Sequence, residues 1–401
     1  MITWPSKLFI LLFFLLPLGL TSGCATPPQS KAPLVADEVL ANEDEIMLWQ
    51  KSAEEQRVLE STGFIYPDQE LEDYLNKVVA RLQAHSSPVD LKMRVKVIKN
   101  AHLNAFAYPN GMIYIHTGLL ARMDNEAQLA AVLAHEMTHS IRRHALRAFR
   151  RYKDQPAFLR AVEHTLSKTR GLQDIARFMG ISGAMAAMSG YTRELEAEAD
   201  RVGLEVMAAA GYDPGEALAL FDHMITEIEQ EGLEEPFFFG SHPKVRQRIE
   251  NLQNLSDSGY INRGPRIKNS EIFLAKLDKL FLDNAGLDIR QGRFQAARRS
   301  VEKYLRIKPD DTRAYFLLGE IFRQRGQVDD ATKAIKYYNQ AIFLDPTYAD
   351  PHKAIGLIHY KKGKRTLAKI FFESSLQLAP DSPDKAYIQA YLKLCAQNGE
   401  G

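Results

Sequence analysis

The chain has 401 residues, of which 45% are hydrophobic, enough to bury more than one core. Its 51 Lys and Arg residues nearly balance 50 Asp and Glu residues, giving a formal net charge of +1. A balanced charge offers no electrostatic basis for binding nucleic acid, so we expect no nucleic-acid partner.

The first 23 residues have the pattern of an export signal. Lys7 is the only charged residue before an apolar run at residues 8–20, and small residues follow that run. The run is too short to span a bilayer comfortably, so we expect no permanent anchor helix. Gly23-Cys24 resembles a bacterial lipoprotein cleavage site, although Thr21 stands where such sites usually carry Leu. We therefore expect lipidation of Cys24, with ordinary cleavage after Ala25 as the alternative.

The predicted lipid anchor also indicates a compartment. Ala25 directly after Cys24 resembles the arrangement in lipoproteins sorted to the outer membrane. The expected location is the periplasm, with anchoring to the outer membrane through lipidated Cys24, and a soluble periplasmic protein is the alternative. The other cysteine is Cys395, so lipidation of Cys24 would leave no intramolecular disulfide.

A small β-sheet is predicted over residues 91–116. Residues 91–98 alternate apolar and basic side chains, which is typical of a half-buried strand. Residues 103–107 and 112–116 flank the segment Tyr-Pro-Asn-Gly, a strong hairpin signal.

The next segment predicts a buried helix. Asn125 can cap its start, and Gln128 three residues later completes a capping-box pairing. The apolar run at residues 129–134 then supplies a face that packs closely, so the two histidines that follow are expected to point inward.

These histidines belong to the motif His135-Glu136-Met137-Thr138-His139. Residues four apart share one face of a helix, so both imidazoles can reach one metal ion. Glu136 would then lie beside the metal and could take a proton from an attacking water. The alternative is a pair of ordinary core or solvated histidines.

A catalytic zinc site needs a third protein ligand, and the acidic segment at residues 191–200 offers one. Glu194, Glu196 and Glu198 compete for this role. Helical spacing places Glu196 and Asp200 on one face and the other two glutamates elsewhere on the surface. One carboxylate of such a pair can bind zinc while the other accepts a hydrogen bond from a ligating imidazole and fixes its tautomer. A solvated acidic helix face is the alternative.

His135-Glu-x-x-His139 followed by Glu196-x-x-Ala199-Asp200 resembles the HtpX, BepA and CAAX-prenyl-protease group of gluzincin-like zinc metallopeptidases. Other family-like segments occur in the same order across residues 60–255. The resemblance implies one Zn²⁺ per chain, held by His135, His139 and Glu196, with Glu136 as general base and acid. It also implies that an edge of the predicted sheet lies above the metal, where an extended peptide could add as a strand; a sheet that serves only as scaffold is the alternative.

Three further residues match the family. Arg193 is implied to order the site, and its guanidinium could stabilise an oxyanion, but a simple salt bridge is equally compatible. His242 could be a removable fourth ligand that blocks the site or an oxyanion donor, and a capping or packing histidine is the alternative. His144 lies five residues after His139 and misses the metzincin spacing, so we interpret it as structural.

Other segments carry weaker signals. His102 and His116 lack a second feature and are interpreted as structural. The basic run from Arg142 to Lys153 is expected to be a solvated face, with a lipid-facing surface as the alternative. Residues 171–190, rich in Gly, Ala and Met, could be a mobile cover, a lipid-contacting loop or a buried helix.

The C-terminal part shows internal repeats. Prolines recur at intervals of 37 and 34 residues and glycines at 34 and 37, at Pro309, Pro346, Pro380, Gly292, Gly326 and Gly363. Gly319 and Gly356 occupy a tight helix-packing position. This pattern resembles tetratricopeptide repeats, helix-turn-helix units of about 34 residues. Ser382-Pro383 precedes a final helix, which is expected to cap the stack.

The sequence thus predicts an α+β, mostly helical fold. A zinc metallopeptidase domain with a small β-sheet is followed by an all-α tetratricopeptide-repeat solenoid. The expected boundaries are residues 1–23 for the lipoprotein-type signal, 24–40 and 256–270 for linkers, 41–255 for the peptidase, and 271–401 for the repeats with their capping helix.

The expected function is that of a zinc-dependent endopeptidase of the bacterial cell envelope. The resemblance to BepA-like periplasmic proteases suggests cleavage of misfolded or misassembled envelope proteins, with the repeats recruiting substrate or an assembly partner. The alternative is a chaperone or assembly scaffold that acts mainly through its repeats and has latent protease activity.

Overall fold

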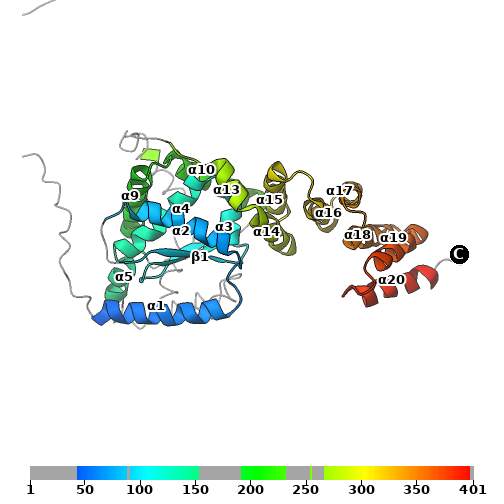
Figure 1. The fold of residues 1–401 in the computed structure, drawn as a ribbon, viewed down its shortest axis with the longest axis horizontal. Helices are drawn as coiled ribbons and strands as arrows, with labels where there is room; N and C mark the ends of the chain where they lie inside the picture. Colours follow the sequence, from blue (N-terminus) through cyan, green and yellow to red (C-terminus); the bar gives the residue numbers. More distant parts are fainter. Residues whose placement is uncertain (1–42, 88–90, 153–190, 232–252, 255–265, 398–401) are drawn as a thin grey trace, which may run out of the picture. The chain divides into compact units, whose positions relative to one another are not determined.

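A computed structural model describes residues 43–87, 91–152, 191–231, 253–254 and 266–397. The predicted signal and linker, residues 171–190 and His242 lie outside the described residues. The elements in chain order (Figure 1) are α1 (Glu43–Ser61), α2 (Gln69–Gln83), β1 (Arg94–Ile98), β2 (Ala105–Ala107), β3 (Met112–His116), α3 (Thr117–Arg122), α4 (Glu126–Ile141), α5 (His144–Tyr152), α9 (Arg193–Ala209), α10 (Gly215–Glu231), α13 (Ser270–Lys276), α14 (Asp278–Arg290), α15 (Phe294–Ile307), α16 (Thr312–Arg325), α17 (Asp330–Leu344), α18 (Ala349–Lys361), α19 (Arg365–Leu378) and α20 (Lys385–Gln397).

The predicted sheet is present and has the strand order β1-β3-β2. β2 and β3 form the expected hairpin, with Ala105 opposite Ile115 in an antiparallel register. β1 pairs with β3 in parallel, with Arg94 opposite Met112. The alternating pattern of residues 91–98 identified this strand, but not its parallel pairing, which depends on how the chain crosses between β1 and β3.

The two faces of the sheet pack against different helices. Val95, Val97 and Ile113 belong to the main hydrophobic core together with residues of α2 and α4. Phe106 and Tyr114 point to the opposite face and share a smaller cluster with Leu59 of α1. Alternate residues of a strand face opposite sides of a sheet, which explains this division. The sheet therefore lies between α1 and the layer formed by α2 and α4 (Figure 1).

The helix that carries the His-Glu-x-x-His motif begins where the sequence predicts. The Asn125 side chain accepts a hydrogen bond from the backbone N–H of Gln128 at 3.0 Å. The Gln128 side chain reaches back to the backbone N–H of Asp124 at 2.8 Å, one residue before the cap. The predicted cap is confirmed. In a standard capping box the Gln128 side chain would bond the backbone N–H of the cap residue Asn125, whereas here it bonds that of Asp124.

α4 and α9 approach each other closely next to the candidate site. A Cβ atom on Gly203 of α9 would lie 3.1 Å from the backbone nitrogen of His135. The absence of a side chain at this position lets the two backbones come together. The close approach brings the acidic residues of α9 within reach of the histidines of α4.

The predicted repeats are confirmed as stacked helix pairs. α16 packs on α17, and α18 packs on α19, before α20 closes the described part of the stack. A Cβ atom on Gly356 would lie 2.8 Å from the ring of Phe372, and one on Gly319 would overlap the ring of Tyr338. These two glycines therefore occupy the tight helix-packing positions that the sequence indicated.

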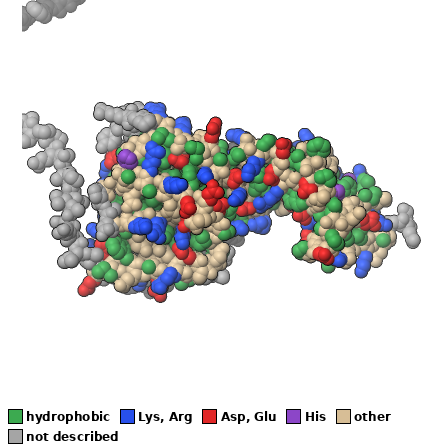
Figure 2. Space-filling model, viewed as in Figure 1, with side chains coloured by type: hydrophobic (Ala, Val, Ile, Leu, Met, Phe, Trp, Pro, Cys, Tyr) green, Lys and Arg blue, Asp and Glu red, His purple; other side chains and the backbone are tan. Residues whose placement is uncertain are grey.

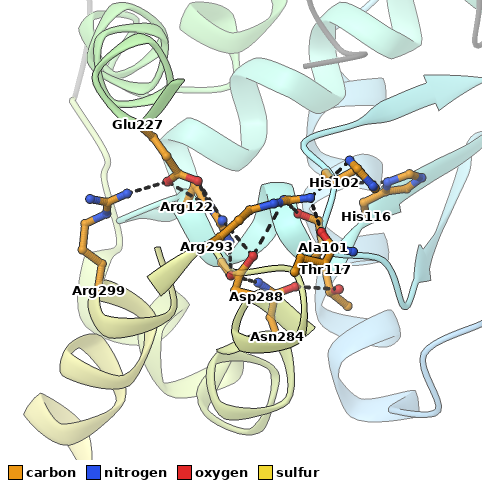
Figure 3. Close-up of polar contacts among 12 residues, drawn as sticks. Ala101, His102, His116, Thr117, Arg122, Glu227, Asn284, Asp288, Arg293 and Arg299 are labelled. Atoms are coloured by element: carbon orange, nitrogen blue, oxygen red, sulfur yellow. Dashed lines mark hydrogen bonds and ion pairs between the residues drawn. The ribbon is translucent and has the colours of Figure 1, made fainter. Parts of the chain in front are cut away.

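Helices α14 and α15 of this region also contact elements from the earlier part of the chain. Arg122 of α3 forms ion pairs with Glu227 of α10 and Asp288 of α14 (Figure 3). Lys303 of α15 donates to the carbonyl oxygens at the C-terminal end of α3, which have no partner within that helix. The predicted boundary at residues 256–270 stays a prediction, but α14 and α15 share a packed, charged junction with α3.

On the face of the molecule shown in Figure 2, acidic and basic side chains are intermixed. Within the described ranges, no helix is both long and apolar enough to cross a membrane.

Candidate metal centre

The structure brings together the three side chains that the sequence nominated as metal ligands. The Nε2 atoms of His135 and His139, one turn apart on α4, lie 3.0 Å from each other. Glu196, in the first turn of α9, places its carboxylate oxygens 3.5 Å from His135 Nε2 and 3.7 Å from His139 Nε2. All three residues are buried.

This arrangement fits zinc. Ligands held about 2.0–2.1 Å from a tetrahedral zinc ion are separated from one another by about 3.3 Å. The measured separations of 3.0 to 3.7 Å lie on either side of that value. Two imidazole nitrogens and one carboxylate form a donor set known from catalytic zinc sites. A divalent cation would also offset the charge of the buried carboxylates of Glu136, Glu196 and Asp200.

Asp200 orients the first histidine. Its Oδ1 lies 3.1 Å from Nδ1 of His135, one helical turn after Glu196. A carboxylate at this distance accepts a hydrogen bond from the Nδ1–H group, which leaves the lone pair on Nε2 for the metal. The four-residue spacing of Glu196 and Asp200 therefore places the two carboxylates on one face, as the sequence predicted.

His139 contacts two residues for which the sequence predicted no role in the site. The Tyr191 ring stacks on His139 with a centroid distance of 4.3 Å and an interplanar angle of 20°. Nδ1 of His144 lies 3.0 Å from Nδ1 of His139. His144 was interpreted as structural on its spacing alone. The only sequence signal for Tyr191 was its place directly before the acidic motif.

Glu136 lies buried beside His135 with 1% of its surface exposed. Burial raises the pKa of the Tyr191 hydroxyl, and the carboxylates of Glu136 and Glu196 raise it further. The same Tyr191 ring stacks on His139. Glu136 is thus buried and follows His135 directly in α4, and its role as proton acceptor stays a prediction.

The other nominated residues differ in what the structure shows of them. Arg193 is the first residue of α9 and is exposed, and its role in ordering the site stays a prediction. Glu194 is also exposed. Glu198 was expected elsewhere on the surface, but it lies 3.4 Å from His144 and 2.9 Å from Arg147. His242 and Cys24 lie outside the described residues, so their roles stay predictions.

The basic run after the metal helix faces carboxylates. Arg143 pairs with Glu45 at 2.7 Å, and Arg150 pairs with Asp44 at 3.3 Å. Both carboxylates belong to α1, so part of the run serves to attach α1 to α5.

In the sequence, Glu136 stands between two histidines that share one helix face, a spacing typical of zinc peptidases. A second helix, α9, supplies the carboxylate of Glu196. Fold and site together define a candidate metal centre of the kind that zinc peptidases carry. The sequence profile of peptidase family M48 matches residues 67–256. Profiles of the TPR repeat and the tetratricopeptide repeat match residues 319–363 and 354–382. The chain thus carries a peptidase family M48 domain with tetratricopeptide repeats on its C-terminal side.

Known relatives share part of this organisation. The beta-barrel assembly-enhancing protease of Escherichia coli K12 is 30% identical over 235 residues, which cover 57% of this chain and 47% of the relative. The mitochondrial metalloendopeptidase OMA1 of Schizosaccharomyces pombe is 32% identical over 192 residues, or 47% of this chain and 54% of the relative. The OMA1 of Saccharomyces cerevisiae is 27% identical over 167 residues, or 40% and 46%. The chain spans about half the length of the curated relatives it matches.

Proposed function

We propose that this protein is a zinc-dependent endopeptidase of the bacterial cell envelope. The observation that carries the proposal is the convergence of His135, His139 and Glu196 in a family M48 domain. The measured separations suit zinc, and the buried Glu136 beside His135 suits a proton-transfer role.

The residues divide the chemistry of peptide hydrolysis among them. Zinc in such a site supplies Lewis-acid polarisation of the peptide carbonyl and of the attacking water. Glu136 would take a proton from the attacking water and pass it to the leaving amine. Asp200 holds the Nδ1 proton of His135, so that Nε2 stays available as a ligand.

The proposed substrates are misfolded or misassembled envelope proteins. The name of the Escherichia coli relative describes a protease that enhances β-barrel assembly, which supports a role for this chain in protein assembly. The tetratricopeptide repeats would recruit substrate or an assembly partner, because stacked helix pairs offer an extended surface for protein binding. We propose that lipidated Cys24 anchors the protein to the periplasmic side of the outer membrane.

The substitution Glu136→Gln tests the proposal. It removes the proton acceptor but keeps the side-chain size, so zinc content should stay unchanged while cleavage of a denatured protein such as casein is lost. The matched control is Glu194→Gln, which changes an exposed glutamate of α9 and should leave cleavage unchanged. Cleavage by Glu136→Gln at the wild-type rate would contradict the proposed mechanism.

The same variant separates proteolysis from a scaffold role. In cells that lack the wild-type protein, Glu136→Gln should fail to restore envelope function. Full restoration would mean that the repeats perform the main task and that proteolysis is secondary.

A further inference from the structure

His144 lies between the second candidate ligand and a carboxylate of α9. The chain leaves α4 after Ile141, and Arg143 adopts a left-handed conformation with φ of 54°. This turn starts α5 and directs the His144 side chain back to His139, with Nδ1 of one ring 3.0 Å from Nδ1 of the other. On the far side of the His144 ring, Nε2 lies 3.4 Å from Glu198 Oε2.

The positions of the protons follow from these contacts. His139 presents Nε2 to His135 and Glu196, so a metal there requires the His139 proton on Nδ1. That proton faces Nδ1 of His144, which must therefore be a bare acceptor. The His144 proton is then on Nε2, which lies 3.4 Å from Glu198 Oε2. A doubly protonated His144 would place two N–H groups against each other, so the geometry selects the neutral ring.

We propose that Glu198 and His144 form a positioning relay that fixes the orientation and the tautomer of His139 for metal binding. Asp200 does the same for His135 by direct contact. His144 and Glu198 act through His139 and are positioning residues rather than catalytic ones. The relay rests on the zinc centre proposed above.

A single helix then supplies the third ligand and both carboxylates that orient the histidines. Glu196, Glu198 and Asp200 follow one another along α9; Glu196 approaches Nε2 of His135, and Asp200 approaches its Nδ1. Glu198 points to a different side and reaches the site through His144. Arg147 of α5, 2.9 Å away, and Arg142, 3.6 Å away, hold the Glu198 carboxylate in place. Attachment of α5 to α9 therefore contributes directly to the geometry of the metal centre.

Zinc affinity, measured by competition with a chelator, distinguishes this role from simple packing. His144→Phe keeps a ring in a site that is 0% exposed but removes the acceptor for His139. Loss of such an orienting partner weakens metal binding about 10- to 100-fold. His144→Asn is smaller, but its side-chain oxygen can accept a hydrogen bond from His139 Nδ1–H, so it should weaken zinc binding less. If His144 served only for packing, His144→Asn would weaken zinc binding more than His144→Phe. That result, or wild-type zinc affinity in His144→Phe, would overturn the relay.

Matched glutamate variants test the other end of the relay. Glu198→Ala should weaken zinc binding in the same direction, whereas Glu194→Ala, four residues earlier on the same helix and exposed, should leave the affinity unchanged. Equal zinc affinities in the two variants would refute the part assigned to Glu198.

Nitrogen NMR of the zinc-loaded wild-type protein, labelled with ¹⁵N-histidine, needs no substitution. The expected spectrum has the His139 proton on Nδ1 and the His144 proton on Nε2. A proton on Nδ1 of His144 would overturn the relay even if the His144 variants fail to fold. A wild-type protein that binds no zinc would refute the proposed function itself, whereas normal zinc binding with unaffected variants would refute the relay alone.

Discussion

The Arg122 guanidinium of α3 lies 2.8 Å from the Asp288 carboxylate of α14 and 2.7 Å from that of Glu227 (Figure 3). No more than 4% of any of these three side chains is exposed. Burial alone would raise the pKa of Glu227, but the charges of Arg122 and Arg299 outweigh it and hold the pKa below its usual value. The junction between the peptidase elements and the first helix pair thus contains a buried, paired charge network.

Removal of Arg122 should strongly destabilise the protein. Arg122→Met leaves two buried carboxylates without their shared partner, and breaking a buried pair in this way costs about 3–5 kcal/mol. The control is Arg298→Ala on α15, which removes an exposed pair with Glu302 and should cost less than about 1 kcal/mol. Denaturant unfolding of both variants measures the difference, and equal losses would contradict the importance of the buried network.

The same network predicts where the chain can be shortened. A fragment that ends at residue 308 keeps α14 and α15. A fragment that ends at residue 269 lacks both helices, so Arg122 and Glu227 become exposed where α14 and α15 had covered them. We expect the longer fragment to be soluble and folded, as judged by circular dichroism and resistance to proteolysis, and the shorter one to aggregate. A well-folded fragment ending at residue 269 would support the predicted domain boundary instead.

Loss of the third ligand should abolish tight zinc binding. Glu196→Ala leaves His135 and His139 with only two protein donors, fewer than a catalytic zinc site requires. Metal analysis after dialysis against a weak chelator should find about one zinc per chain in the wild type and almost none in the variant. Full zinc retention by Glu196→Ala would show that another residue is the third ligand.

Two glycines of the helical region should respond oppositely to the same change. A Cβ on Gly356 would lie 2.8 Å from Phe372, so Gly356→Ala should cost about 1–3 kcal/mol through overpacking. Gly286 in α14 has open space, with Arg290 as its nearest neighbour at 3.8 Å. Gly286→Ala should stabilise by about 0.5–1 kcal/mol, because alanine favours the helix. Thermal unfolding midpoints that shift in the same direction for both would contradict this packing.

His116 should make the protein less stable in mild acid. Burial, and then the nearby His102, lower the pKa of His116 to about 3. The unfolded chain takes up this proton below about pH 6.5, but the folded protein does not, so the free energy of unfolding falls as the pH drops. At pH 5 the loss is about 2 kcal/mol relative to pH 7.5.

The metal-free protein is the appropriate sample for this measurement, because zinc binding has its own pH dependence. His116→Gln removes the titrating group, so its stability should fall less between pH 7.5 and 5 than that of the wild type. The same decline in both proteins would show that His116 does not contribute.

Much of the site and the fold is predictable from local patterns in the sequence. The four-residue spacings of His135 with His139 and of Glu196 with Asp200 place each pair on one helix face, whatever else the chain does. The Tyr-Pro-Asn-Gly turn and its flanking apolar residues specify the hairpin of β2 and β3. The recurrence of glycines and prolines identifies the repeats, because equivalent helix-packing positions in successive repeats need the same small residues.

Only the tertiary structure decided which distant residues support the metal-facing histidines. Tyr191 stacks on His139, and Glu198 meets His144, across more than 50 residues of chain that carry no periodic signal linking them. The parallel pairing of β1 with β3 and the contact of Arg122 with Asp288 are likewise set by how whole elements pack. Local sequence determines which face of a helix a side chain occupies, whereas the partner on that face depends on the helices brought against it.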